Sequence, residues 1–489
     1  MSYDLYNKIY LDYLAKVYQK TYINFVNHII DINKITLEFL NQKAAELSKK
    51  EKEEVMPANG HDIYNYVARY GISNFQIQAV MKFDGHLDFQ TLTKAVMLSI
   101  EEEPVFGCRF VEAEPPYWKR INNLEPSMVC SMEETKDLEQ SIKTYLETPL
   151  DMDNDPMVKV KLLRIREHDT LCFKVNHSCC DGVGTIEYIK LVSDIYNNLN
   201  LLGIYRPTPR MRTRADQDRL FSELGITDPE SEWISGSEIT RATWPFPWVQ
   251  VQSNTERMVV LQLDPGYLPA IRKFSRIHDV KVNDILLTAF YRAMARMGQP
   301  VYTEPMEIPV TIDLRRYLPD RKTESIRNFS GSEISRVLLV ENEIFTETLS
   351  KVASEMNRIK NSRGGLQSAI GLERVERLTL SETLAYYKLV SQWSYYCGDK
   401  CAPVLSNLGV LSHQLIKFGE RTALDFYIIP PVVRPPGLLL MAGTYNSVIT
   451  LAVGIYEGTV AREEIEKLLG FIKEELTGIC RGDLITANS

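Results

Sequence analysis

Apolar residues recur at roughly helical spacing in the first segment of the chain, residues 1 to about 55. No proline or glycine interrupts this segment, and it ends in a charged run at Lys49–Glu54. The pattern predicts an N-terminal extension made of one long helix or a helical hairpin. We expect it to pack on the main body, or to serve docking or self-association. Contact with a membrane surface is disfavoured, because the polar face is not strongly basic. The apolar positions are Leu5, Ile9, Tyr13, Val17, Ile23, Val26, Ile30, Leu37 and Leu40.

From Met56 onward, short strand patterns alternate with helix patterns, which is typical of α/β folds. One predicted helix opens with an acidic first turn at Asp88, and another opens at Val282 with Asp284 near its positive end. Strands are expected over residues 75–83, 106–111, 158–165, 171–175, 259–263, 306–311, 332–339, 423–429 and 447–456. Helices are expected over residues 88–103, 185–199, 265–278, 285–297 and 462–476.

A chain of 489 residues is too long for one ordinary core, so two or more domains are expected. Residues 205–255 are rich in proline and charge, which is typical of a linker or crossover. The run Trp244–Trp248 within it is expected to pack this linker onto a domain. The predicted units are an N-terminal helical extension (1–56), a first half (57–225), a linker or crossover (226–257) and a second half (258–489).

Charge and composition narrow the class of protein. The net charge of -8 disfavours a general nucleic-acid binder, which needs a positive field to attract phosphates. The 8 cysteines show no C-x-x-C pair, which favours free thiols in a reducing compartment. The N-terminus lacks the basic and apolar regions of a secretory signal. The most apolar stretch, Gly437–Tyr456, alternates like strands and does not read as a membrane span. We therefore expect a soluble cytoplasmic protein without a transmembrane segment.

His177, Asp181 and Gly182 form an H-x-x-x-D-G run between a predicted strand and a predicted helix. Gly182 and Gly184 allow a tight turn at this point. Imidazole has a pKa near neutrality, so His177 could take a proton from an attacking hydroxyl or amine and return it to a leaving thiolate. The run therefore nominates His177 as the general base of an acyl transfer. Asp181 could orient the ring or lock the loop, and we favour an ion pair with an arginine elsewhere in the chain.

The same run permits three other interpretations. In the first, Cys179 or Cys180 is a nucleophile with a histidine partner, although adjacent residues on one short loop rarely reach that geometry. In the second, His177, Cys172, Cys179 and Cys180 bind a metal, although their spacing is not that of a zinc site. In the third, His177 is a core residue whose polar atoms are satisfied by neighbours. We expect no metal here.

Six short segments in a fixed order extend the pattern beyond the histidine. They are Phe106–Glu112, Asn176–Gly182, Val282–Leu287, Pro309–Arg315, Ser406–Gly409 and Tyr445–Leu451. In this order they resemble the L-R-x-x-F-x-E, H-H-x-x-x-D-G, T-x-N-D-V-L-L, V-N-L-R, S-N-x-G and Y-N-G-x-L-x-L segments of the CoA- and carrier-protein-dependent acyltransferase superfamily. That superfamily includes nonribosomal peptide condensation domains, alcohol acetyltransferases, polyketide-associated acyltransferases and wax-ester synthases. The resemblance covers about residues 57–480.

This resemblance implies two chloramphenicol-acetyltransferase-like domains in a V-shaped pseudo-dimer. The active site would lie at their junction, in a tunnel that donor and acceptor enter from opposite faces. The resemblance also implies His177 as the catalytic base, Asp181 as a structural carboxylate paired with Arg315, and Gly182 as the residue that keeps the loop tight. The residues implied to line the substrate tunnel are Asn176, Ser178 and Asn407.

The chain departs from the family pattern at Asn176, which replaces the first histidine of the pair. The second histidine performs the chemistry in family members, so the resemblance still implies an acyltransferase. It would move an acyl group from acyl-CoA or an acyl-phosphopantetheinyl carrier protein to a small-molecule hydroxyl or amine, with no permanently bound cofactor. Two alternatives are a free-standing condensation enzyme that forms an amide between carrier-bound substrates, and a catalytically silent relative that binds a carrier protein or another enzyme. We see no adenylation segment and no G-G-x-S carrier segment, which favours a free-standing enzyme with a separate donor.

Overall fold

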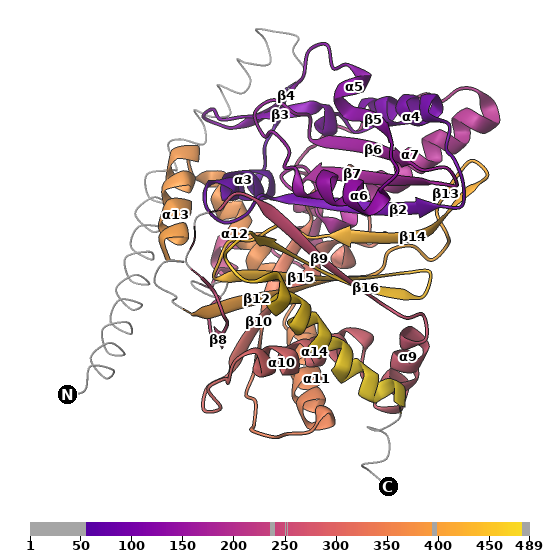
Figure 1. Ribbon diagram of the computed structural model, residues 1–489. Helices are drawn as coiled ribbons and strands as arrows, with labels where there is room; N and C mark the ends of the chain where they lie inside the picture. Colours follow the sequence, from indigo (N-terminus) through magenta and orange to yellow (C-terminus); the bar gives the residue numbers. More distant parts are fainter. Residues whose placement is uncertain (1–54, 235–239, 250, 252, 394–398, 482–489) are drawn as a thin grey trace.

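The computed structural model describes residues 55–234, 240–249, 251, 253–393 and 399–481 (Figure 1). The predicted helical extension lies outside these residues up to position 54. Two large sheets organise the described chain, one in the upper part of Figure 1 and one in the lower part. The α/β fold class and the division into two sheet-centred halves are therefore confirmed, while the exact domain boundaries stay a prediction.

The first sheet has six strands in the order β13-β14-β2-β7-β6-β5. Helices α4 (Phe89–Glu102) and α7 (Gly182–Leu202) pack on one of its faces, and α6 (Leu138–Glu147) packs on the other. The strands are β13 (Lys417–Phe418), β14 (Arg421–Ile429), β2 (Gln76–Phe83), β7 (Asp169–Asn176), β6 (Val158–Arg164) and β5 (Cys130–Glu134).

The second sheet has the order β11-β10-β12-β15-β16-β9, with β8 (Trp244–Pro245) paired to β12. Four helices lie below it in Figure 1 and share its main core: α9 (Tyr267–Ile277), α10 (Val282–Met297), α11 (Phe345–Asn361) and α14 (Arg462–Arg481). The strands are β11 (Ser330–Val337), β10 (Met306–Asp313), β12 (Lys400–Val410), β15 (Gly437–Tyr445), β16 (Val448–Tyr456) and β9 (Glu256–Leu263).

A third, small sheet in the order β1-β4-β3 lies against helix α3 (Gly60–Val67). Helix α3 also packs on α12 (Leu366–Arg377) and α13 (Leu380–Trp393) from the C-terminal part of the chain. The remaining elements are β1 (Val55–Pro57), β3 (Cys108–Val111), β4 (Tyr117–Arg120), α5 (Pro126–Val129), α8 (Ala215–Glu223) and the 3-10 turns η1 (Ala68–Tyr70), η2 (Pro104–Gly107), η3 (Pro229–Glu232) and η4 (Leu314–Tyr317).

Strand β7, which leads into the H-x-x-x-D-G run, is buried along its whole length. Leu171 and Phe173 face the core beneath α4 and α7, because alternate side chains of a strand point to opposite faces. Cys172 faces the other way, into a smaller core that also holds Met258 and Ala452 of the second sheet. The two sheets therefore enclose a shared apolar layer, and burial on both faces explains the consecutive apolar residues Leu171, Cys172 and Phe173 of β7.

The second half contributes strands to the first sheet. Strand β14 was predicted as a strand over residues 423–429, inside the range assigned to the second half. It pairs antiparallel with β2 of the first sheet, so Phe426 lies opposite Met81. The alternation of apolar residues predicts a strand but not the sheet that it joins. This pairing joins the second half to the sheet whose strand β7 leads into His177.

The start of one strand differs from the sequence prediction, and another predicted strand is preceded by a tight turn. Phe106 and Gly107 belong to the 3-10 turn η2, and the strand β3 begins only at Cys108. The strand expected over residues 447–456 is confirmed as β16, and it is preceded by a two-residue hairpin turn in which Asn446 and Ser447 have φ values of 46° and 67°. Asparagine favours this left-handed region, and such two-residue turns match the twist of paired strands.

Among the described residues, no helix combines the length and the apolar character needed to cross a bilayer. The apolar stretch Gly437–Tyr456 forms the β15–β16 hairpin, as its alternation predicted.

Candidate active site

His177 directly follows β7, and the loop after it leads into the long helix α7. Asp181 caps that helix, with its Oδ1 accepting a 2.7 Å hydrogen bond from the N–H of Gly184. A Cβ on Gly184 would lie 2.9 Å from the Cβ of Cys180 and 3.1 Å from the carbonyl oxygen of Arg327. Glycine at this position therefore lets the loop fold tightly against the segment that contains Arg327.

The imidazole of His177 is held on two sides. Its backbone N–H donates to the carbonyl of Phe75 at 2.7 Å, and the two rings lie 5.5 Å apart between centroids. Nδ1 lies 3.0 Å from Oδ1 of Asn328, a residue just before β11 of the second sheet. Burial lowers the pKa of His177 below 6.5, while its own backbone, Asp181 and Asn328 oppose that shift. A neutral imidazole can accept a proton, which is the state that a general base needs.

Asp181 and Arg315 form a buried ion pair across the two halves. Nη1 of Arg315 lies 3.0 Å from Oδ2 of Asp181, and the side chains are 1% and 5% exposed. The same carboxylate oxygen accepts the N–H of Phe329 at 2.7 Å, and Arg315 Nη2 donates to the carbonyl of Arg327 at 2.8 Å. Burial alone would raise the pKa of Asp181, but Arg315 and the hydrogen bonds hold it below 3.8. The ion pair that the resemblance implies is therefore present and locks the loop in place.

Asn176 and Ser178 bond to each other within the loop. Oδ1 of Asn176 accepts the N–H of Ser178 at 2.9 Å and its hydroxyl at 2.6 Å. Nδ2 of Asn176 lies 2.7 Å from the sulfur of Met152. Both side chains are buried. Asn176 thus holds the backbone of Ser178, the residue after His177. That Asn176 and Ser178 line the substrate tunnel stays a prediction.

Asn407 belongs to β12 of the second sheet, at an irregularity where Gly409 has a φ of 63°. Its Nδ2 donates to Oδ1 of Asn283 at 3.0 Å, and its Oδ1 accepts the N–H of Gly409 at 2.9 Å. A Cβ on Gly182 would lie 2.8 Å from Cδ2 of Leu408, the residue next to Asn407. The structure therefore brings the H-x-x-x-D-G, N-D and S-N-x-G segments together, although they lie far apart in sequence.

The cysteines of the loop have the properties of core residues. Cys172, Cys179 and Cys180 are all 0% exposed. Burial raises the pKa of the Cys172 thiol to about 12 and that of Cys179 well above 9.0. Because the nucleophile is the thiolate, Cys179 is poorly suited to attack a substrate. The described residues contain no cluster of three or more His, Cys, Asp or Glu side chains placed to hold a metal ion.

Two residues that support the site, Arg212 and Asn328, were not predicted from the sequence. Arg212, read as part of a charged linker, is buried and donates from Nη1 to Asp62 at 3.0 Å and from Nη2 to the carbonyls of Cys179 and Ile326. Asn328 contacts His177 itself. The only sequence signal was the density of arginines after residue 205, and nothing in the sequence around Asn328 distinguishes it.

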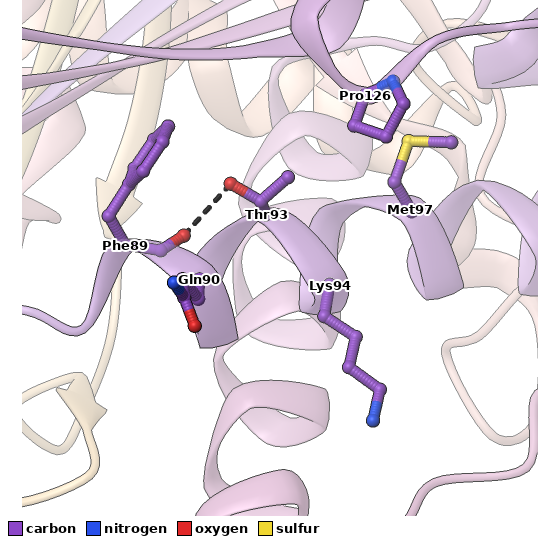
Figure 2. A pocket seen from close by; sticks show the side chains of 6 residues that line it. All are labelled: Phe89, Gln90, Thr93, Lys94, Met97 and Pro126. Carbon is purple, nitrogen blue, oxygen red and sulfur yellow. Dashed lines mark hydrogen bonds between the residues drawn. The ribbon is translucent and has the colours of Figure 1, made fainter.

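A groove of about 780 Å³ opens beside the loop, and Met152, which contacts Asn176, is one of its lining residues. Tyr66, Arg109 and Lys119 also line it. A second pocket of about 490 Å³ lies on α4 (Figure 2). Its lining residues are Phe89, Gln90, Thr93, Lys94, Met97 and Pro126, none of which belongs to the His177 loop. The hydroxyl of Thr93 donates to the Phe89 carbonyl of its own helix, so this pocket offers no comparable constellation.

Comparisons with known proteins agree with this geometry. Residues 70–210 match the family model described as "Condensation domain". The trichothecene 15-O-acetyltransferase TRI3 from Fusarium sporotrichioides is a similar solved structure, with a TM-score of 0.66, 12% identity, and coverage of 87% of this chain and 95% of that chain. The first condensation domain of the calcium-dependent antibiotic synthetase gives a TM-score of 0.65 and 13% identity, with 88% and 97% of the chains covered.

Polyketide synthase associated protein 5 from Mycobacterium tuberculosis is also similar, with a TM-score of 0.60, 13% identity, and 87% and 97% of the chains covered. These similarities extend over both sheets, well beyond the residues that match the family model. They confirm the two-domain fold expected from the six sequence segments. The first half of the chain therefore contains a segment that matches the condensation-domain model, and both halves together share the fold of these solved structures.

Proposed function

We propose that the protein is an acyltransferase that moves an acyl group from a CoA or carrier-protein thioester to a hydroxyl or amine, with His177 as the general base. The observation that supports this most is the imidazole of His177. Burial lowers its pKa, Asn328 contacts its Nδ1, and a buried ion pair between the two halves holds its loop.

The chemistry assigned to His177 is a proton transfer in two directions. Nε2 would accept the proton of the acceptor hydroxyl or amine while its oxygen or nitrogen attacks the thioester carbonyl. Collapse of the tetrahedral intermediate would break the C–S bond, and the imidazolium would return the proton to the departing thiolate. Gly182 begins α7, so its N–H has no acceptor within the helix and lies at the positive helix end. We propose this N–H as a donor to the developing oxyanion.

The choice of donor and acceptor rests on the names of similar proteins. TRI3 is a 15-O-acetyltransferase, and the antibiotic synthetase domain is a condensation domain. This chain aligns with nearly the whole length of each of these two proteins. O-acylation and amide formation are therefore the two reactions to distinguish. CoA or a pantetheinyl carrier protein would act here as donor substrate and not as a resident cofactor. A carrier protein is accordingly a candidate partner.

The test is thiol release from acyl-CoA and acyl-pantetheine donors of different chain length, with hydroxyl and amine acceptors. Acceptor-dependent thiol release together with an ester or amide product supports the proposal. Amide formation only from carrier-bound substrates would favour the condensation enzyme. A complex with an acylated carrier protein, without turnover of any donor, would favour the silent relative, which the replacement at Asn176 motivates.

The pH dependence of the reaction should report the buried histidine. A base must be neutral to accept a proton, and burial lowers the pKa of His177 below 6.5. We therefore expect the acid limb of kcat/KM to have its midpoint below pH 6.5. A profile of kcat/KM against pH checks this. An acid limb at or above 6.5 would contradict a neutral, desolvated His177 in the free enzyme.

A further inference from the structure

The side-chain amide of Asn328 has an orientation that its neighbours determine. Its Nδ2 lies 2.8 Å from the carbonyl oxygen of His177 and 3.0 Å from that of Ser178. Carbonyl oxygens only accept hydrogen bonds, and of the two amide atoms only the nitrogen donates. A flipped amide would place its oxygen against both carbonyls. The contacts therefore assign nitrogen toward the backbone and oxygen toward the imidazole.

This orientation determines which ring nitrogen of His177 is protonated. Oδ1 of Asn328 lies 3.0 Å from Nδ1 and can only accept, so Nδ1 must carry the hydrogen. In a neutral imidazole with the hydrogen on Nδ1, the free lone pair lies on Nε2. Nε2 is then the atom that can take a proton from an acceptor.

Asn328 is itself held by the segment around it, Glu324–Phe329, which joins η4 to β11. The N–H of Ile326 lies 3.1 Å from both carboxylate oxygens of Glu103, and the N–H of Phe329 lies 2.7 Å from Asp181. Nη1 of Arg327 donates to Asp216 at 2.9 Å. Asn328 is 1% exposed. This strap from the second half is thus fastened onto the first half on both sides of Asn328.

We propose that Asn328 is a positioning residue that sets the tautomer and orientation of His177, so that the base is competent only while the strap Glu324–Phe329 is docked. Asn328 acts through the imidazole and contacts no substrate. Its contribution to rate rests on the proposed acyl transfer, whereas the tautomer is a property of the resting protein. Partners that orient a histidine in this way are worth about 10- to 100-fold in activity where they have been removed beside metal-bound histidines.

The first experiment measures the tautomer without any substrate. The full chain is labelled with ¹⁵N-histidine, and the signals of His177 among the 7 histidines are identified by their loss in His177→Ala. We expect a protonated Nδ1 and an unprotonated Nε2 in the wild type. In Asn328→Ala we expect part of the population to move its hydrogen to Nε2. A protonated Nε2 in the neutral wild type, or an unchanged tautomer in Asn328→Ala, would overturn the proposal.

The second experiment measures rate and pH dependence. Asn328→Ala should lower kcat about 10- to 100-fold with KM nearly unchanged, because Asn328 acts on the imidazole and not on the substrate. Asn328→Asp should move the acid limb of kcat/KM to higher pH, because a carboxylate stabilises the imidazolium. Asn65→Ala is the matched control, since Asn65 is also buried and donates to a backbone carbonyl, that of His61. It should change neither the limb nor the tautomer.

The two experiments separate this inference from the proposed function. The expected tautomer with no turnover of any thioester would leave Asn328 as the positioning residue and remove the acyltransferase proposal. If acyl transfer required His177 but the resting imidazole carried its hydrogen on Nε2, the acyltransferase proposal would stand and the role assigned to Asn328 would be wrong. An acid limb that stays in place in Asn328→Asp would show that Asn328 only supports the fold, and would overturn the inference.

Discussion

Replacing His177 with alanine is expected to lower kcat for acceptor-dependent thiol release by about 10²- to 10⁴-fold, the usual contribution of a general base. The proposed reaction needs a group that removes the acceptor's proton as the thioester carbonyl is attacked. Among the side chains gathered at the loop, the half-buried imidazole of His177 is suited to this, because burial lowers its pKa, whereas burial raises the pKa of the Cys179 thiol. The measurement is initial thiol release at saturating donor and acceptor.

His86→Ala is a matched control for this variant. His86 is exposed and follows β2, whose other end pairs with the end of β7 beside His177, because Gln76 lies opposite Asn176. The two histidines therefore lie at opposite ends of the same sheet. We expect His86→Ala to retain the wild-type rate. If His177→Ala also retained it, His177 would be a structural residue and the general-base assignment would be wrong.

Much of the fold could be predicted because burial leaves a regular trace in sequence. Strand β7 is apolar on both faces, and α4 begins where Asp88 caps it by accepting the N–H of Thr91. The helices α11, α12 and α13 escaped prediction, and α12 is short and strongly charged. The placement of β14 in the first sheet could not be predicted, because strand pairing over hundreds of residues depends on the assembled core.

The candidate site likewise contains residues that the sequence predicted and residues that it did not. His177 and Asp181 were named from the chemistry of their run and Arg315 from the family resemblance, and the structure places Asp181 and Arg315 in one ion pair. Asn328 lies in no such run or segment. It meets His177 across a sequence separation of 151 residues, and an asparagine in an irregular connection is locally unremarkable. Its role depends on two backbone carbonyls, and those come together only in the folded chain.

Breaking the buried ion pair between Asp181 and Arg315 should lower the free energy of unfolding more than breaking an exposed ion pair does. Arg315→Met is expected to lower the free energy of unfolding by about 3–5 kcal/mol, because it leaves the Asp181 carboxylate buried without its cation. Urea titration at pH 7 measures the loss. At that pH the full effect is present, since the folded-state pKa of Asp181 is depressed below 3.8. The contribution would disappear only as the pH falls through that depressed value.

The companion variants show whether the cost comes from the unpaired charge. In Asp181→Asn/Arg315→Met no buried charge is left unpaired, so we expect a smaller loss than the sum of the two single changes, with a coupling of about 0.5–3 kcal/mol. Arg462→Met is the control, because Arg462 and Glu466 are 46% and 50% exposed and should contribute about 0–1 kcal/mol. A loss in Arg315→Met no larger than in this control would contradict a locking role for the ion pair. Additive losses would show that Arg315 acts mainly through its other contacts, with Asp313 and the carbonyl of Arg327.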